Sequence, residues 1–170
     1  MNELEYITET FKHKKYILES CSLLVEFLYK SGRAGEAKAL ANRCMVHDAS
    51  KMSEKELQGF IKLNNIKESM TNSASKLNDY EKEIISVHWK NNRHHPEYFD
   101  DYHDMTEIDI MEMCCDWHSR SKEYGTNFLD FVKERQKNRF HFDKEFFSRV
   151  FFYCCVLEEY DISKTVVCKA

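Results

Sequence analysis

The chain contains very few residues that turn or break a polypeptide backbone. Only four glycines and one proline occur among its 170 residues, whereas Glu, Lys, Leu, Met and Ala are plentiful. Glycine and proline dominate tight turns, and the plentiful residues favour helices. We therefore predict an all-α fold built from long helices rather than a many-stranded sheet.

The length and the apolar content predict one domain that spans residues 1–170. Hydrophobic residues make up 42% of the chain, including twelve Phe, which is enough to form a core without disulfides. Cys114–Cys115 and Cys154–Cys155 lie in apolar helical patterns, and no CxxC spacing occurs. The cysteines are therefore interpreted as reduced core thiols rather than as ligands of a structural zinc.

The charge pattern argues against nucleic acid and membrane partners. The formal net charge is −4, the pI is about 6.1, and lysines alternate with acidic residues instead of forming a basic surface. No stretch approaches the ~18 apolar residues of a membrane span, and the first nine residues already carry three acids. We therefore expect a cytoplasmic protein.

Apolar residues recurring every three or four positions predict a bundle of about six to seven helices. Two S/N-x-x-E capping boxes, Ser53–Glu56 and Asn78–Glu81, mark helix starts, and Thr106 can cap a central helix that is apolar nearly all round. The predicted helices cover residues 4–29, 34–48 and 54–63, stretches that follow Asn78 and Thr106, and residues 127–136 and 143–160.

Two segments are predicted to be irregular. Residues 67–77, "KESMTNSASKL", are small and polar, which predicts a loop and leads to the hypothesis that it acts as a lid over the site. Pro96 disfavours helix at His95, so "NNRHHPEYFDDYHD" is predicted to end one helix and cross irregularly to the next. Loops with this many functional side chains often line a site.

Several polar residues fall on apolar helix faces or at predicted helix ends. Imidazole and carboxylate ligands together suit Mn, Fe, Co, Ni or Zn, and a buried carboxylate is costly unless it is paired or bound to a cation. These residues therefore predict a site for one or two divalent transition metal ions. In chain order they are His13, His47, Asp48, His88, His94, His95 and Asp116.

Each of these histidines, taken alone, could also be an ordinary core or surface residue, because a single buried histidine is more often a packing residue than a metal ligand. His94 and His95 are neighbours that point in different directions in regular structure, and the spacing of seven from His88 favours His95. Trp89 and Trp117 either border the site or pack in the core. The remaining histidines, His103, His118 and His141, are interpreted as surface or packing residues.

The order H…HD…H…HH…D resembles the HD-domain metal-dependent phosphohydrolase superfamily. It is also similar to the HD-GYP branch, in which a lysine follows the HD pair as Lys51 does in "HDASK". The GYP segment is missing and His88 stands close to His94, so hydrolysis of cyclic dinucleotides does not carry over. More closely, "HDASKMSEKEL", "HWKNNRHHPEYF" and "EMCCDW" resemble a group of uncharacterised bacterial and viral HD-like proteins.

The resemblance implies that one metal is held by His13, His47, Asp48 and Asp116. A second would be held by Asp48, His88 and either His94 or His95. Two such ions can activate a water as hydroxide, which attacks phosphorus, and can neutralise the charge that develops on the phosphoryl group.

Three further residues are candidates for catalytic roles beside Asp48. Lys51 and Arg93 could hold phosphate oxygens, although Lys51 could equally be a solvated lysine after a helix. Glu112, one turn before Asp116, could orient a ligand histidine or act as an acid.

The function expected first is hydrolysis of a small phosphorylated substrate, a nucleotide or related phosphoester. The same ligands leave open an HD-fold diiron oxygenase, which would consume oxygen and release no phosphate. A third alternative is an inactive nucleotide-binding or signalling module. The aromatic run "FDKEFFSRVFFYCC" is expected in the core, and its excess of aromatic residues also leaves open a homodimer interface.

Overall fold

The computed structural model describes residues 1–69 and 79–167, and all regular structure within these residues is helical. This confirms the predicted all-α bundle. Three short 3-10 helices, Ala49–Met52 (η1), Pro96–Tyr98 (η2) and Tyr102–Asp104 (η3), and a π-helical turn, Gln136–Phe140 (η4), connect the longer elements. The α-helices are Glu3–Lys30 (α1), Ala34–Val46 (α2), Glu54–Ser69 (α3), Asp79–Asn91 (α4), Glu107–Tyr124 (α5), Phe128–Arg135 (α6) and Lys144–Val167 (α7).

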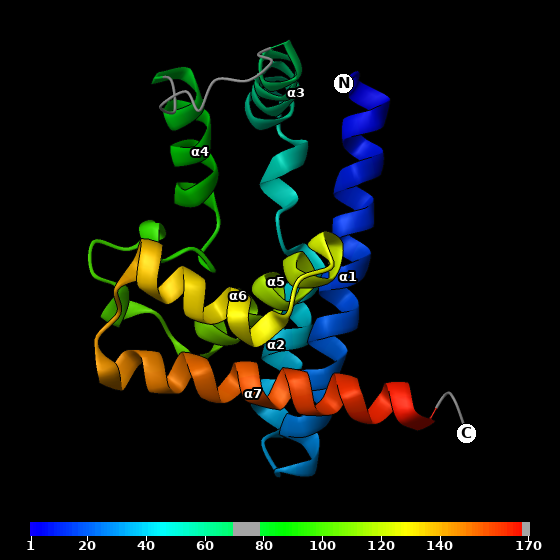
Figure 1. Cartoon of the computed structure of the whole chain (residues 1–170), viewed down its shortest axis with the longest axis vertical. Helices are drawn as coiled ribbons and strands as arrows, with labels where there is room; N and C mark the ends of the chain where they lie inside the picture. The colour runs from blue at the N-terminus through cyan, green and yellow to red at the C-terminus, as the bar shows by residue number, and fades with distance from the viewer. Residues whose placement is uncertain (70–78, 168–170) are drawn as a thin grey trace.

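The helices pack around α5, which lies at the centre of the molecule. Figure 1 shows α1 running along much of the long axis, α7 crossing it towards one end, and α3 and α4 standing together at the other end. Both α1 and α7 pack against α5, so this helix is buried on almost every side. The central position predicted from its all-round apolar pattern is confirmed.

Both ends of α5 are capped, and the cap at its start is the one that the sequence predicts. The Thr106 hydroxyl accepts a hydrogen bond from the Asp109 N–H, and the Asp109 carboxylate accepts one from the Thr106 N–H. At the other end, Gly125 adopts φ +63°, a left-handed conformation that glycine takes without steric cost. These caps hold α5, and therefore Asp116, in a fixed register within the core.

The second helix ends earlier than predicted, at Val46 rather than at Asp48. His47 has φ −50° and ψ 131°, and Asp48 has φ +56°, in the left-handed region. Asp tolerates this region better than most residues, and such conformations cluster at functional sites. The break lets two adjacent side chains face the same point, which successive residues of a helix do not.

The third helix is longer than predicted because it continues to Ser69, so residues 67–69 of the predicted loop are helical. Most of the segment predicted to act as a lid, residues 70–77, lies outside the described residues, as does the predicted helix cap Asn78. Helix α3 packs closely on α4 at Gly59, where an added Cβ would come within 2.6 Å of the Ile84 Cδ1 atom. The absence of a side chain at Gly59 therefore allows α3 and α4 to pack close together.

The C-terminal third differs from expectation in the ends of two helices. The helix predicted for residues 127–136 ends at Arg135 and continues as the π-turn η4, and α7 extends to Val167. The cysteines of the described residues are free thiols, and all but the half-buried Cys155 are fully buried, which confirms the core interpretation. Within the described ranges no helix combines the length and apolarity that a membrane crossing requires.

Candidate metal centre

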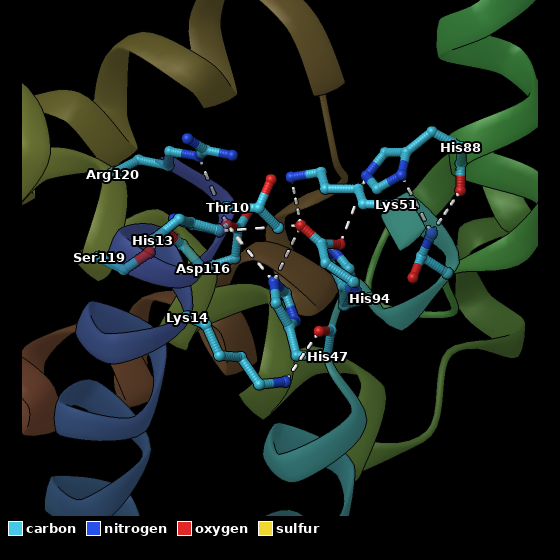
Figure 2. Close-up of polar contacts among 12 residues, drawn as sticks. Thr10, His13, Lys14, His47, Lys51, His88, His94, Asp116, Ser119 and Arg120 are labelled. Atoms are coloured by element: carbon cyan, nitrogen blue, oxygen red, sulfur yellow. Dashed lines mark hydrogen bonds and ion pairs between the residues drawn. The ribbon is translucent and has the colours of Figure 1, made fainter. Parts of the chain in front are cut away.

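The predicted ligand residues converge from four parts of the fold. His13 comes from α1, the His47–Asp48 pair from the break after α2, and Asp116 from α5. His88 lies near the end of α4, and His94 and His95 lie in the irregular segment that follows. In Figure 2 the side chains of His13, His47 and Asp116 point towards one another, with Lys51 and His94 beside them.

The first group of ligand atoms comprises His13, His47 and Asp116, whose donor atoms lie within 4.8 Å of one another. The Asp116 Oδ1 atom is 3.2 Å from His13 Nε2 and 3.8 Å from His47 Nε2. The Asp48 Oδ2 atom lies 3.8 Å and 3.5 Å from the same two nitrogens. Two imidazoles and two carboxylates thus surround one point.

The second group comprises Asp48, His88, His94 and His95, again within 4.8 Å of one another. The other oxygen of Asp48, Oδ1, is 3.4 Å from His88 Nε2 and 3.5 Å from His94 Nε2. Asp48 therefore presents one oxygen to each group. Both His94 and His95 belong to this set, whereas helical spacing alone favoured His95.

The opposite nitrogen of three of these histidines faces a second carboxylate. The Nδ1 atoms of His13, His47 and His88 lie 2.7, 3.0 and 2.9 Å from the carboxylates of Glu123, Glu112 and Glu56. Carboxylates in this position fix the tautomer and the orientation of a metal-binding histidine.

These outer carboxylates are ionised. Burial would raise the pKa of Glu112, but hydrogen bonds with His47 and His94 lower it to about 2. In the same way, burial opposes but hydrogen bonds with His88 and His13 lower the pKa values of Glu56 and Glu123. An ionised carboxylate only accepts hydrogen bonds, so each Nδ1 donates a hydrogen bond to the carboxylate beside it and each Nε2 faces inward.

Lone pairs that face carboxylate oxygens repel unless a cation lies between them. Among the described residues, the buried polar side-chain atoms without a hydrogen-bond partner fall mainly at this point. They include His13 Nε2, His47 Nε2, His94 Nε2, His95 Nε2, Asp48 Oδ1 and Asp116 Oδ1. Imidazole nitrogens and carboxylate oxygens that lack a hydrogen-bond partner can act as metal ligands, and this combination suits a divalent transition metal ion.

The protonation of the rings is compatible with this use. Burial lowers the pKa of His47 to about 4, and burial together with His94 and His88 holds the pKa of His95 well below its usual value. Both rings are therefore neutral near pH 7. For His94, burial is outweighed by Glu112 and Asp48, which raise its pKa. Metal binding at His94 would thus compete with a proton.

Of the two roles predicted for Glu112, its contacts fit the orientation of a ligand histidine and not the role of an acid. Its Oε1 atom accepts from His47 Nδ1 and lies 3.5 Å from His94 Nδ1, and Oε2 accepts from Arg43 at 2.6 Å. A carboxyl group with a pKa of about 2 has no proton to donate at neutral pH, which argues against the predicted acid role. The ion pair with Arg43 keeps this carboxylate in place.

Arg93 is predicted to contact a phosphate, but in the structure it pairs with Asp109 and is not among the residues that line the cavity beside the ligand groups. Its guanidinium makes two bonds to Asp109, at 3.1 and 3.0 Å, and lies over the rings of Tyr98 and Phe99. Because Asp109 also pairs with Arg43, Arg93 belongs to the network behind Glu112. The side chain stabilises the site from outside and does not face the cavity.

Lys51 does lie at the site, where it is buried and pairs with Asp48. Its Nζ atom is 2.5 Å from Asp48 Oδ2. The same side chain lines a cavity of about 510 Å³ that opens beside the second group, together with His88, His95 and Asp116. Trp89 and Trp117 also line this cavity, so both tryptophans border the site.

Three residues at the site were not predicted as site residues from the sequence: Glu56, Glu123 and Arg120. Glu56 was assigned to the Ser53 capping box, and its N–H does bond to Ser53 Oγ at 3.4 Å, but its carboxylate turns inward to His88. Arg120 and Glu123 follow Asp116 at four and seven residues on α5. That spacing places them on one helix face, a signal that was available in the sequence.

Replacing Glu56 by Gln is expected to weaken metal binding at the second group by ~10–100-fold, because His88 loses its ionised acceptor. Titration of the metal-free protein would measure this change, with binding at the first group unaffected. Glu54→Gln, an exposed change in the same turn of α3, is the matched control. Equal affinities in both variants would mean that Glu56 does not act through His88.

The histidines left out of the pattern lie elsewhere. His118 is buried and shares a hydrogen bond of 2.9 Å with Ser20, and His103 is exposed between Asp101 and Asp143. His141 ends η4 in a left-handed conformation. All three fit their predicted surface or packing roles.

Comparison with known proteins gives a family and no relative of known function. The model described as "Family of unknown function (DUF5662)" matches residues 2–150, which include the whole candidate metal centre. No curated protein and no solved structure matches the chain. Because the matched region covers most of the sequence, the chain belongs to DUF5662, a family of unknown function.

Proposed function

We propose that this protein is a metal-dependent phosphohydrolase or phosphodiesterase of the HD type, acting on a small phosphoester. The observation that supports this most strongly is the convergence of unpartnered imidazole nitrogens and carboxylate oxygens on two adjacent points that share Asp48. Bound ions at such a paired site supply an activated water and neutralise charge on a phosphoryl group.

In this proposal the chain holds the ions with two sets of ligands. His13, His47, Asp48 and Asp116 form the first, and Asp48, His88, His94 and His95 form the second. Glu123, Glu112 and Glu56 fix the tautomers of three of the ligand rings. Because these supports come from the packed helices α3 and α5, the ligand geometry is set by the fold and not by one flexible loop.

Lys51 and Arg120 would bind the phosphate. Both line the 510 Å³ cavity, and each already lies beside a ligand carboxylate, Lys51 at Asp48 and Arg120 Nε at 3.7 Å from Asp116. Arg120 also donates to Glu123 at 2.8 Å, which orients its guanidinium. A phosphate at the mouth of this site would therefore meet two cations beside the ligand groups.

The proposal is tested by stripping the protein with a chelator, reloading it with Mn, Fe, Co, Ni or Zn, and assaying p-nitrophenyl phosphate, bis(p-nitrophenyl) phosphate and nucleoside monophosphates. We expect product release that depends on at least one of these metals and is absent from the stripped protein. Oxygen consumption by the iron-loaded protein without phosphate release would instead indicate the diiron oxygenase. Tight nucleotide binding without product would indicate an inactive binding module.

A further inference from the structure

The 510 Å³ cavity has a second cluster of cations at its outer side. Besides Lys51 and Arg120, it is lined by Arg135 and Arg139, whereas Asp116 is its sole acidic lining residue among those the structure describes. Arg139 and Trp89 also line the adjoining outer pocket with Lys82 and Ile85, so they stand at the rim rather than at the ligand groups. The cavity is therefore cationic at both ends.

The outer arginines are held by aromatic rings. The Arg139 guanidinium lies 5.1 Å from the ring centre of Trp89 and 4.6 Å from that of Phe140, and Arg135 lies 4.7 Å from that of Phe131. Stacking of this kind fixes the plane of a guanidinium while its edge N–H groups remain directed outward. Such an edge matches a carboxylate or phosphate, which it can bind with two parallel hydrogen bonds.

The acidic partners of these arginines leave donors for a ligand. Arg139 donates to Glu97 through Nε and Nη2, at 3.3 and 2.7 Å, which engages only part of a five-donor group. Arg135 Nε lies 4.0 Å from the exposed Glu134 carboxylate, and a pair at this distance contributes little.

The π-turn η4 brings these side chains to the cavity. The His141 N–H bonds to the Gln136 carbonyl at 3.0 Å, and the Gln136 side chain bonds to both the N–H and the carbonyl of Phe142. Residues four and five apart in a π-helix share a face, and Arg135, Arg139 and Phe140 all line the cavity. The ring of Phe140 stacks on that of Trp117, with 5.3 Å between the ring centres. Trp117 directly follows Asp116, so this contact connects η4 to the metal-ligand region.

We infer that the cavity accepts a substrate with two anionic groups, one at the metal ligands and a second held by Arg135 and Arg139, with an apolar body between them. The aromatic side chains of Trp117 and Phe140 stack on each other in the lining of the cavity and provide an apolar surface. This inference rests on the proposed function for the identity of the first group. Arg135 and Arg139 are then specificity-determining residues.

The test compares two non-hydrolysable ligands by titration calorimetry, benzylphosphonate and 4-carboxybenzylphosphonate, which differ only in the second anion. The protein as purified is expected to bind the two-anion ligand about tenfold more tightly, because its second anion adds charge-assisted hydrogen bonds to the guanidinium groups. In Arg135→Gln/Arg139→Gln this preference should disappear while benzylphosphonate binding is retained.

Lys133→Gln/Lys137→Gln is the matched control, because it removes the same charge from exposed positions in the same segment. It should keep the preference. The single Arg135→Gln variant makes the same comparison without disturbing the Arg139–Glu97 pair. Equal affinities for both ligands in the unaltered protein, no binding of either, or a preference that survives in both arginine variants would overturn the inference.

Binding is measured without turnover, so the two proposals can fail separately. A preference for the two-anion ligand in a protein that hydrolyses no phosphoester would remove the proposed function and leave the second anion site standing. Phosphoester hydrolysis without any such preference would do the reverse.

Discussion

Replacing His47 and Asp48 together by alanine is expected to abolish the metal binding that we propose for this protein. The change deletes one ligand that belongs to the first group and the carboxylate that faces both groups. Elemental mass spectrometry on protein purified without chelator or metal-affinity tag should find one or two equivalents in the unaltered protein and none in the variant. Any metal-dependent hydrolysis should fall to background with it.

The chain contains its own control, because a second His–Asp pair occurs at His103–Asp104 in η3. That pair is exposed and lies outside both ligand groups, so its replacement by alanine should leave the metal content unchanged. Thermal melts of both variants verify that they fold. A folded His47→Ala/Asp48→Ala protein with full metal content would exclude the proposed centre.

Replacing Phe146 by alanine is expected to lower the free energy of unfolding by ~3–5 kcal/mol, which is the usual cost of removing a buried phenyl group and leaving a cavity. The side chain is 1% exposed and packs against the rings of Tyr102 and Phe142. For a chain of this length the melting temperature should fall by about 6–20 °C. Denaturant or thermal unfolding followed by circular dichroism measures the change.

Phe152→Ala on the same helix is the comparison, because that ring is 50% exposed. Its replacement should lower stability by much less. Similar losses in the two variants would mean that the aromatic run of α7 contributes through something other than burial in the core, such as a contact between two copies of the chain.

The helical architecture was predictable because it follows from local rules. Scarce turn formers, capping residues such as Thr106, and apolar residues at helical spacing each act within a few positions of the chain. Predictions failed where a local rule had more than one outcome. Ser53 and Glu56 have the spacing of a capping box, but the Ser53 N–H donates to the Ser50 carbonyl and the Glu56 carboxylate turns to the buried Nδ1 of His88.

The pair of adjacent histidines shows a related limit. Helical spacing from His88 favoured His95, but α4 ends at Asn91 and the backbone at His95 is extended, with φ −93° and ψ 127°. In this irregular segment the rings of His94 and His95 lie 4.1 Å apart, and both belong to the second group. Periodicity does not apply where the helix has ended, so it could not assign either residue.

The sequence by itself determined that the chain is helical and which residue types could meet as ligands, because periodicity, caps and ordered His and Asp residues are local properties. Only the tertiary structure decided what surrounds them. The outer carboxylates, the pairing of Arg93 with Asp109, and the position of Arg139 beside Trp89 and Glu97 depend on contacts between residues 16 to 110 positions apart. Such pairings follow from how helices cross, which no local pattern encodes.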